Sequence, residues 1–170
     1  MTATMYPENR AVEVWRDEGG VQYSIVRVEH HEIALRWDPR GGHYCGYCRF
    51  IERPLVEPGD KGIATYVPVH WGITYANDDE DGMVYGFDCN HLDDDRNLQV
   101  EDIKWVKAEC ERMARGILLA AEYEEEYLAS EGDARAEVLD RYIAQCREEN
   151  IDLKINENVG VMINLLAGEL

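Results

Sequence analysis

Apolar and polar residues alternate over much of the first hundred positions, the pattern of strands with one buried face. Ala11 to Arg16 and Val21 to Val28 lie on either side of a Gly-containing turn and predict a hairpin. The same signals predict further strands over Ile33 to Trp37, His43 to Ile51, Thr65 to Tyr75 and Met83 to Cys89. Because short links join neighbouring strands, we expect an antiparallel sheet.

After Asp95 the apolar spacing becomes helical. A long amphipathic helix is predicted from about Val100 to about Ala129, on an apolar stripe of Ile103, Val106, Cys110, Met113 and Ile117. Gly132-Asp133 is typical of a helix stop followed by a new N-terminus, and a second helix follows. We expect the apolar segment Val159 to Leu166 to dock as a short helix.

These elements predict one α+β domain over residues 1–170, strand-rich over 1–98 and helical over 99–170, with the antiparallel sheet packed against the long helix. A length of 170 residues with 45% apolar composition suffices for one substantial core. The chain shows neither a membrane-spanning run nor a secretory signal, so we expect a soluble, cytoplasmic protein. Five cysteines, an odd number, fit reduced thiols better than disulfides.

The charge is strongly negative: 35 acidic against 17 basic residues give a net charge of −18. Such a surface repels phosphates and anionic lipids, so we expect no direct binding to nucleic acid or to membranes. Solubility alone accounts for the charge. The alternative is an acidic inhibitor that mimics nucleic acid through three stretches: Asp78 to Asp81, Asp93 to Asp95 and Glu122 to Glu126.

Two strand-like runs carry a histidine together with small or polar residues, which favours a ligand site. Alternate residues of a strand share a face, so His70, Thr74 and Asp88 can converge if the runs pair. Tyr75 and His91 complete the predicted recognition surface. The structural alternative is that these polar side chains form hydrogen bonds to one another inside an ordinary sheet and bind no ligand.

Metal binding is a second hypothesis. Cys45 and Cys48 have the spacing of a zinc knuckle, and Cys89 and His91 are candidates for the remaining ligands. A redox pair or inert buried thiols are alternatives. A calcium site is a further hypothesis, because oxygen-bearing residues are spaced around a glycine as in a calcium-binding loop. These residues are Asn77, Asp79, Asp81, Gly82 and Asp88. A solvated hairpin tip is the alternative explanation for them.

Three segments together resemble a family of small proteins from bacteriophages and bacterial genomes: His43-Tyr44-Cys45-Gly46-Tyr47, Val69-His70-Trp71-Gly72-Ile73-Thr74-Tyr75 and Gly86-Phe87-Asp88-Cys89-Asn90-His91, followed by Trp105-Val106 and Glu109-Cys110. In that family two glycines usually follow the first histidine, and here Trp71 takes one of those places. The resemblance implies a viral or mobile-element context and no particular activity.

A binding protein is therefore predicted rather than an enzyme, because the chain has no nucleophile elbow and no phosphate-cradling glycine loop. The leading hypothesis is a phage-type accessory or counter-defence protein that captures a small polar molecule or a host protein. Self-association into a homo-oligomer stays open.

Overall fold

The computed structural model describes residues 11–30, 40–52, 56–58, 61–91 and 94–151. Five strands precede two long helices, which confirms the α+β class. The strands are β1 (Ala11–Arg16), β2 (Gln22–Glu29), β3 (Gly42–Phe50), β4 (Tyr75–Asp79) and β5 (Gly82–Asp88), and the helices are α1 (Ile103–Ala129) and α2 (Gly132–Glu148). The last strand ends at Asp88 and the first long helix begins at Ile103.

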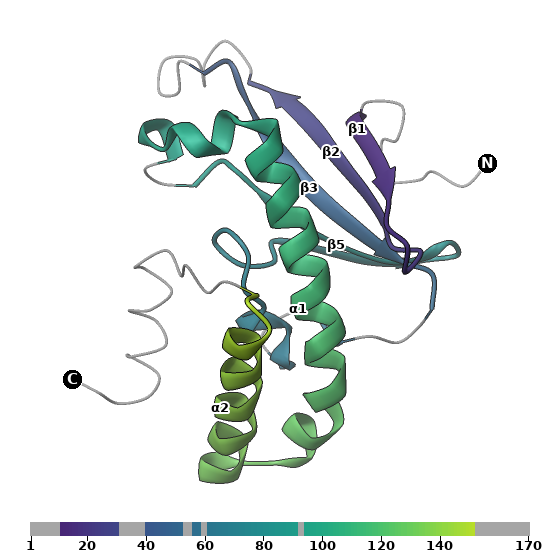
Figure 1. The fold of residues 1–170 in the computed structure, drawn as a ribbon, viewed down its shortest axis with the longest axis vertical. Coiled ribbons are helices and arrows are strands. Elements are labelled where there is room, and N and C mark those ends of the chain that lie inside the picture. The colour runs from purple at the N-terminus through teal and green to yellow at the C-terminus, as the bar shows by residue number, and fades with distance from the viewer. Residues whose placement is uncertain (1–10, 31–39, 53–55, 59–60, 92–93, 152–170) are drawn as a thin grey trace. The chain divides into compact units, whose positions relative to one another are not determined.

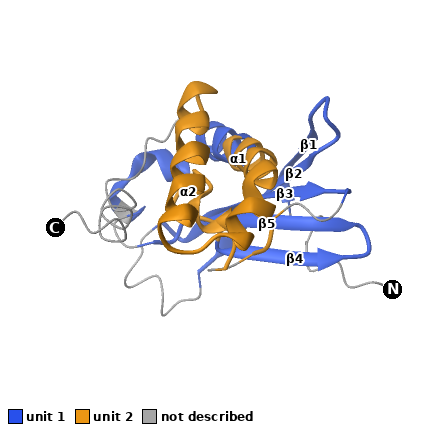
Figure 2. Ribbon diagram, turned by 90° about the horizontal axis from the view of Figure 1, so that it is seen from below, with its two compact units in different colours: residues 1–53, 74–111 blue, residues 54–73, 112–170 orange. Residues whose placement is uncertain are grey.

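All strand pairs are antiparallel, in the order β1-β2-β3-β5-β4. Figure 1 labels β1, β2, β3 and β5, and Figure 2 labels all five strands. β1 and β2 form the predicted hairpin around Asp17 to Gly20, where Gly20 has a φ of 85° that a residue with a side chain rarely adopts. β4 and β5 form a second hairpin with an acidic tip. β5 therefore lies between β3 and β4, so residues of these three strands can line one surface.

The chain divides into two compact units (Figure 2). The first contains residues 1–53 and 74–111, and so holds the whole sheet together with the start of α1. The second contains residues 54–73 and 112–170, and so holds the rest of α1 and α2.

Within the first unit, the start of α1 packs on one face of the sheet. Gly46 of β3 permits this close packing: a Cβ atom there would lie 2.6 Å from Cys110 Sγ and 2.8 Å from Phe87 Cζ. We call this side the helix face and define it by residues that are almost fully buried: Ile25, Gly46, Cys48, Tyr85 and Phe87. Their burial supplies the apolar area that stabilises the sheet.

In the second unit, α1 and α2 are joined by a buried polar contact, because the Tyr142 hydroxyl donates to the carbonyl of Gly116 at 3.1 Å. Glu124 differs from its acidic neighbours in α1, because it is buried and does not belong to a solvated surface. Its side chain is 9% exposed and accepts hydrogen bonds from the backbone N–H groups of Glu57 at 2.8 Å and Ile63 at 3.0 Å. Glu122, Glu125 and Glu126 are exposed, as expected.

The predicted strand Thr65 to Tyr75 is wrong. Residues Ile63–Tyr66 form a 3-10 helix, a turn follows, and β4 begins only at Tyr75. Two features explain the error: Pro68 cannot donate to a strand ladder, and positive φ angles at Trp71 (56°) and Gly72 (88°) turn the chain sharply. The alternation of apolar residues in this segment therefore does not reflect a strand.

Two other predicted elements, Ile33 to Trp37 and Val159 to Leu166, lie outside the described residues. Within the described part of the chain, neither long helix carries the unbroken apolar stretch that crossing a bilayer would require.

Candidate functional site

A pocket of about 370 Å³ lies where β3, β5 and the start of β4 come together, and apart from Phe87 its strand residues belong to the sheet face opposite the helix face. We call this side the pocket face. The pocket is lined by His43, Cys45, Tyr47, Thr74, Tyr75, Phe87, Asp88 and Asn90. All of these residues belong to the first unit.

The strand register builds the pocket around a glycine. Tyr47 of β3 and Tyr75 of β4 are both paired with Gly86 of β5, so the three residues form one cross-strand row on the pocket face. Since Gly86 has no side chain, the two rings meet above it edge to face, with centroids 5.6 Å apart. A Cβ atom on Gly86 would lie 2.7 Å from Tyr47 Cε1, so the ring occupies the space that a side chain would fill.

Asp88 ends β5 and supplies a carboxylate to the pocket. Its cross-strand partner is Cys45, which places the thiol and the carboxylate beside each other on the same face. Its Oδ1 atom accepts a hydrogen bond from the backbone N–H of Asn90 at 3.0 Å. The side chain of Asp88 is 30% exposed, so this carboxylate is accessible to a ligand.

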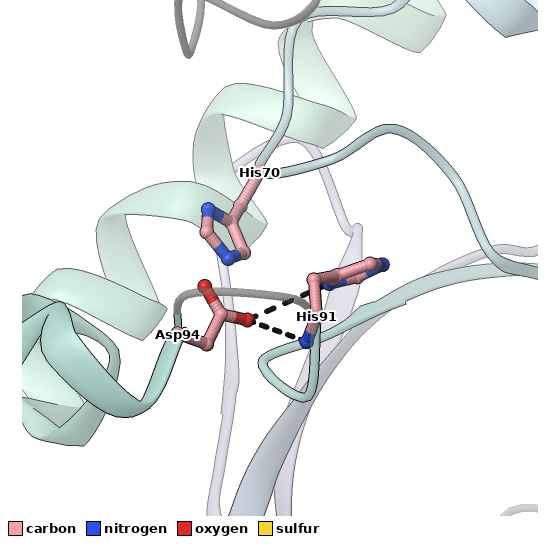
Figure 3. Close-up of side chains that lie close together, drawn as sticks. All are labelled: His70, His91 and Asp94. Atoms are coloured by element: carbon pink, nitrogen blue, oxygen red, sulfur yellow. Dashed lines mark hydrogen bonds and ion pairs between the residues drawn. The ribbon is translucent and has the colours of Figure 1, made fainter.

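Behind Asp88, His91 and Asp94 form a second layer. The backbone N–H of His91 donates to Asp94 Oδ2 at 2.8 Å, and His91 Nδ1 lies 3.6 Å from that oxygen (Figure 3). The same Nδ1 lies 3.6 Å from Asp88 Oδ1. The imidazole is therefore placed between two carboxylates, of which that of Asp94 is buried and that of Asp88 faces the pocket.

The two histidines near the pocket have opposite pKa shifts. Burial works to lower the pKa of His91, but the hydrogen bond to Asp94 and the charges of Asp88 and Asp94 outweigh burial and raise it above 6.5. The pKa of His43 is lowered by burial and by the neighbouring His30, whose Nε2 lies 2.8 Å from His43 Nδ1. The charge of Asp88 opposes this lowering only in part. Near neutral pH, His43 thus adds no positive charge to the pocket wall.

The remaining ionisable groups of the pocket are neutral at physiological pH. Burial and the charge of Asp88 raise the pKa of the Cys45 thiol to about 11. Burial also raises the pKa of Tyr47 and of Tyr75. Asp88 is consequently the one charged side chain among the lining residues, surrounded by neutral donors and aromatic rings.

Arg40 holds the backbone behind this site. Its Nη1 atom donates to the carbonyls of Cys89 at 3.2 Å and Asp94 at 3.4 Å, and it lies 3.7 Å from Glu101 Oε1. Sequence reasoning missed this role because Arg40 lies in a glycine-rich turn far along the chain from residues 89–94. A buried arginine that donates to carbonyls fixes the chain where Asp88 and His91 are presented.

Three of the five residues predicted for the recognition surface line the pocket together: Thr74, Tyr75 and Asp88. His91 contacts Asp88 from behind. His70 belongs to the second unit, where it lies in a turn, 7% exposed, with its ring in edge contact with Trp71. The expectation that both histidines lie on strands is wrong, since His91 follows the end of β5. Sequence reasoning missed His43, Tyr47 and Asn90 as pocket residues, although all three fall in segments of the family resemblance.

The zinc candidates are divided between the two faces of β3. Cys45 pairs with Val26 and Asp88 on the pocket face, whereas Cys48 pairs with Tyr23 and Tyr85 on the helix face. Burial raises the pKa of Cys48 and of Cys89, and both side chains are fully buried. The described geometry thus does not present the two thiols of the knuckle spacing to one ion.

The acidic hairpin tip, considered as a calcium loop, is engaged by an arginine. Arg49 donates to both carboxylate oxygens of Asp79, at 2.9 and 3.3 Å, and lies 3.8 Å from Asp81 Oδ2. A bidentate guanidinium satisfies the oxygens that a cation would need. The acidic stretches considered for nucleic-acid mimicry are likewise partly used internally, by Asp79, Asp94 and Glu124.

Comparison with protein-family models, with curated proteins and with solved structures found no match to this chain.

Proposed function

We propose that this chain is a non-enzymatic protein that binds a small polar molecule in the pocket of its first unit. The observation that carries the proposal is the convergence of Thr74, Tyr75 and Asp88 with Cys45 and Tyr47 around one hollow of about 370 Å³. By the volume of liquid water this is room for roughly a dozen water molecules, which suits a metabolite-sized ligand.

The composition of the wall supports binding rather than simple packing. Ligand pockets combine apolar and aromatic surface with a few polar groups that fix orientation. Here the rings of Tyr47 and Tyr75 supply the aromatic surface, and Thr74 and Asn90, both exposed, supply polar side chains at the start of β4 and after β5. Asp88 supplies an acceptor whose position is fixed by Asn90 and His91.

The glycine in the row supports the same conclusion. An ordinary sheet would place a side chain at position 86 to fill the space between neighbouring strands. Gly86 instead leaves room for the two tyrosine rings, and glycine within a strand often marks a place where a ligand or another backbone approaches closely. The position of the Tyr47 ring in the pocket wall therefore depends on the residue at position 86 of β5.

The biological setting we propose is that of a phage-type accessory or counter-defence protein that sequesters its ligand in the cytoplasm of the host cell. The resemblance of residues 43–47, 69–75 and 86–91 to phage and bacterial proteins motivates this setting. Binding without turnover fits the neutral state of the Cys45 thiol, because the thiolate is the nucleophilic form of cysteine.

Native mass spectrometry of the full chain purified from cells tests the proposal. We expect a co-purified or added small polar molecule on the wild-type protein and its loss from a Tyr75→Ala variant. A Tyr123→Ala variant, which removes a tyrosine from the second unit, is the matched control and should keep the ligand. If no small polar molecule binds the folded wild-type protein, or if binding survives Tyr75→Ala, the proposal is wrong.

A further inference from the structure

We propose that the ligand of this pocket is a small organic cation, with a primary ammonium or similar basic group seated against Asp88 and the rings of Tyr47 and Tyr75. This inference rests on the proposed function and specifies the chemical class of the ligand.

The distribution of charge around the pocket is the first argument. Of the eight lining residues, Asp88 alone carries a formal charge at neutral pH, and the lining contains no lysine or arginine. Asp94 adds a buried carboxylate behind it. A carboxylate ligand or a phosphate ligand would meet repulsion from Asp88, whereas an ammonium group would gain a charge-assisted hydrogen bond.

The cations nearest to the site are already paired elsewhere. Arg27 donates to Glu101 Oε2 at 3.0 Å, and Arg40 lies 3.7 Å from Glu101 Oε1 while donating to the carbonyls of Cys89 and Asp94. Arg49 is paired with Asp79. When His91 is protonated, its charge is shared between Asp88 and Asp94, so the three side chains together still carry a net negative charge.

The aromatic geometry is the second, independent argument. Tyr47 and Tyr75 meet at an interplanar angle of 90°, so their ring planes form two perpendicular walls. Cations bind favourably over the face of a tyrosine ring, and proteins recognise ammonium ligands with cages of several aromatic rings. Asp88 lies two residues along β5 from Gly86, which is the next position on the same face as the Tyr47–Gly86–Tyr75 row. A basic group seated at Asp88 is therefore also beside the rings.

A matched set of probes tests the charge preference with the full chain. Benzylammonium, benzyl alcohol and benzoate share a ring and a methylene or carboxyl carbon but differ in charge, and each can be titrated while backbone amide NMR signals are followed. We expect benzylammonium to shift the signals of Thr74, Tyr75 and Asp88, with a dissociation constant about tenfold to a hundredfold lower than that of benzyl alcohol. Benzoate should leave these signals unchanged.

Two variants make the test specific to Asp88. Asp88→Asn keeps the size of the side chain and removes the charge, and it should bring the affinity for benzylammonium to that for benzyl alcohol. Glu80→Gln removes one charge from the exposed tip of the same hairpin and should leave the affinity unchanged. The amide spectrum of each variant reports whether its fold is intact. If Asp88→Asn does not fold, the wild-type comparison of the three probes still decides the proposal.

The outcomes separate this inference from the proposed function. If benzyl alcohol or benzoate shifts the pocket signals with an affinity equal to or higher than that of benzylammonium, the pocket binds ligands and the cation inference is wrong. Equal loss of affinity in Asp88→Asn and Glu80→Gln would also overturn it, because the effect would then be one of net charge. If no probe shifts these signals, and native mass spectrometry finds no bound small molecule, both proposals fail.

Discussion

The two faces of β3 differ in what lies against them. On the helix face, Gly46 and Cys48 are buried against apolar and aromatic neighbours, with Cys48 fully inaccessible. On the pocket face, His43, Cys45 and Tyr47 line a hollow. Because successive side chains of a strand point to opposite sides, six consecutive residues divide between a packed core and a binding surface.

This division explains how a short segment serves two purposes at once. The glycines make the point most directly. Gly46 permits the close approach of Phe87 and Cys110, whereas Gly86 of the neighbouring strand leaves space that the ring of Tyr47 enters. On each face the missing side chain lets an aromatic ring lie close to the sheet backbone. Variants on the helix face should therefore change stability, and variants on the pocket face should mainly change binding.

The largest expected effect compares two aliphatic residues of β2. Ile25 is fully buried on the helix face, whereas Val28 is 39% exposed and pairs with His43 on the opposite face. Ile25→Ala should reduce the free energy of unfolding by about 2–5 kcal/mol because it leaves a cavity. Val28→Ala should cost less than about 1 kcal/mol, since an exposed site buries little area. Chemical denaturation measures both. Equal losses would contradict the distinction between the faces.

The next effect compares the two glycines. Gly46→Ala and Gly86→Ala each add a methyl group where a close contact exists, and each should cost about 1–3 kcal/mol of stability through overpacking. Only Gly86→Ala should also displace the Tyr47 ring and weaken ligand binding. Gly19→Ala, whose Cβ would lie 3.3 Å from Asp17 Oδ1 in the turn between β1 and β2, is the control for adding a methyl group. Retained binding in Gly86→Ala at unchanged affinity would argue against the role of this row.

A smaller effect concerns pH. The pKa of His91 is raised in the folded protein despite its burial, because it is placed between Asp88 and Asp94. The protonated His91 side chain therefore stabilises the folded protein fully at a pH below its pKa in the unfolded chain. This stabilisation is lost as the pH rises through its pKa in the folded protein. His91→Asn should cost most near about pH 5, by roughly 1 kcal/mol or less, and least near about pH 9.

His43→Asn is the control with the opposite sign. Burial and His30 lower the pKa of His43, so its neutral form is favoured in the folded state. The stabilisation of the fold by neutral His43 is therefore lost as the pH falls below about 6.5. Thermal denaturation of both variants and the wild type across this range measures the two trends. Parallel trends would show that the assigned surroundings of one histidine are wrong.

The smallest effect separates Cys45 from Cys48. A pKa of about 11 instead of 9.0 leaves about a hundredfold less thiolate on Cys45 than on an unperturbed thiol near neutral pH, so alkylation should be slow. Cys48 should react more slowly still, because it is fully buried on the helix face. Peptide mass mapping after alkylation of the native protein measures both rates, and a pocket ligand should protect Cys45 alone. Faster labelling of Cys48 would contradict the assignment of faces.

Most of the fold could be predicted from local patterns. The β1–β2 hairpin follows from its glycine turn, and α1 from apolar spacing that places Val106, Cys110 and Met113 in full burial. The segment from Ile63 to Thr74 could not, because its apolar residues alternate as in a strand while Pro68 and the positive φ angles at Trp71 and Gly72 decide its course. Backbone angles of this kind leave only a weak signal in a single sequence.

The candidate site was predictable to the extent that it depends on sequence neighbours. Thr74, Tyr75 and Asp88 come together because β4 and β5 form a hairpin, which the acidic turn between them indicates. The contribution of β3 was not predictable, since nothing in the sequence specifies that β3 pairs with β5 and places Tyr47 over Gly86. Arg40 was missed for the same reason: its partners are carbonyl oxygens, and carbonyls have no sequence signature.

The carboxylate of Glu124 gives the second unit an unusual dependence on one side chain. It is the shared acceptor for two amide groups six positions apart, and its Oε1 lies 2.7 Å from where a Cβ on Gly62 would stand. One side chain of α1 therefore holds the backbone at both residue 57 and residue 63. A Glu124→Asp variant has a shorter side chain, so we expect proteolysis between residues 57 and 63 to be faster in this variant than in the wild type.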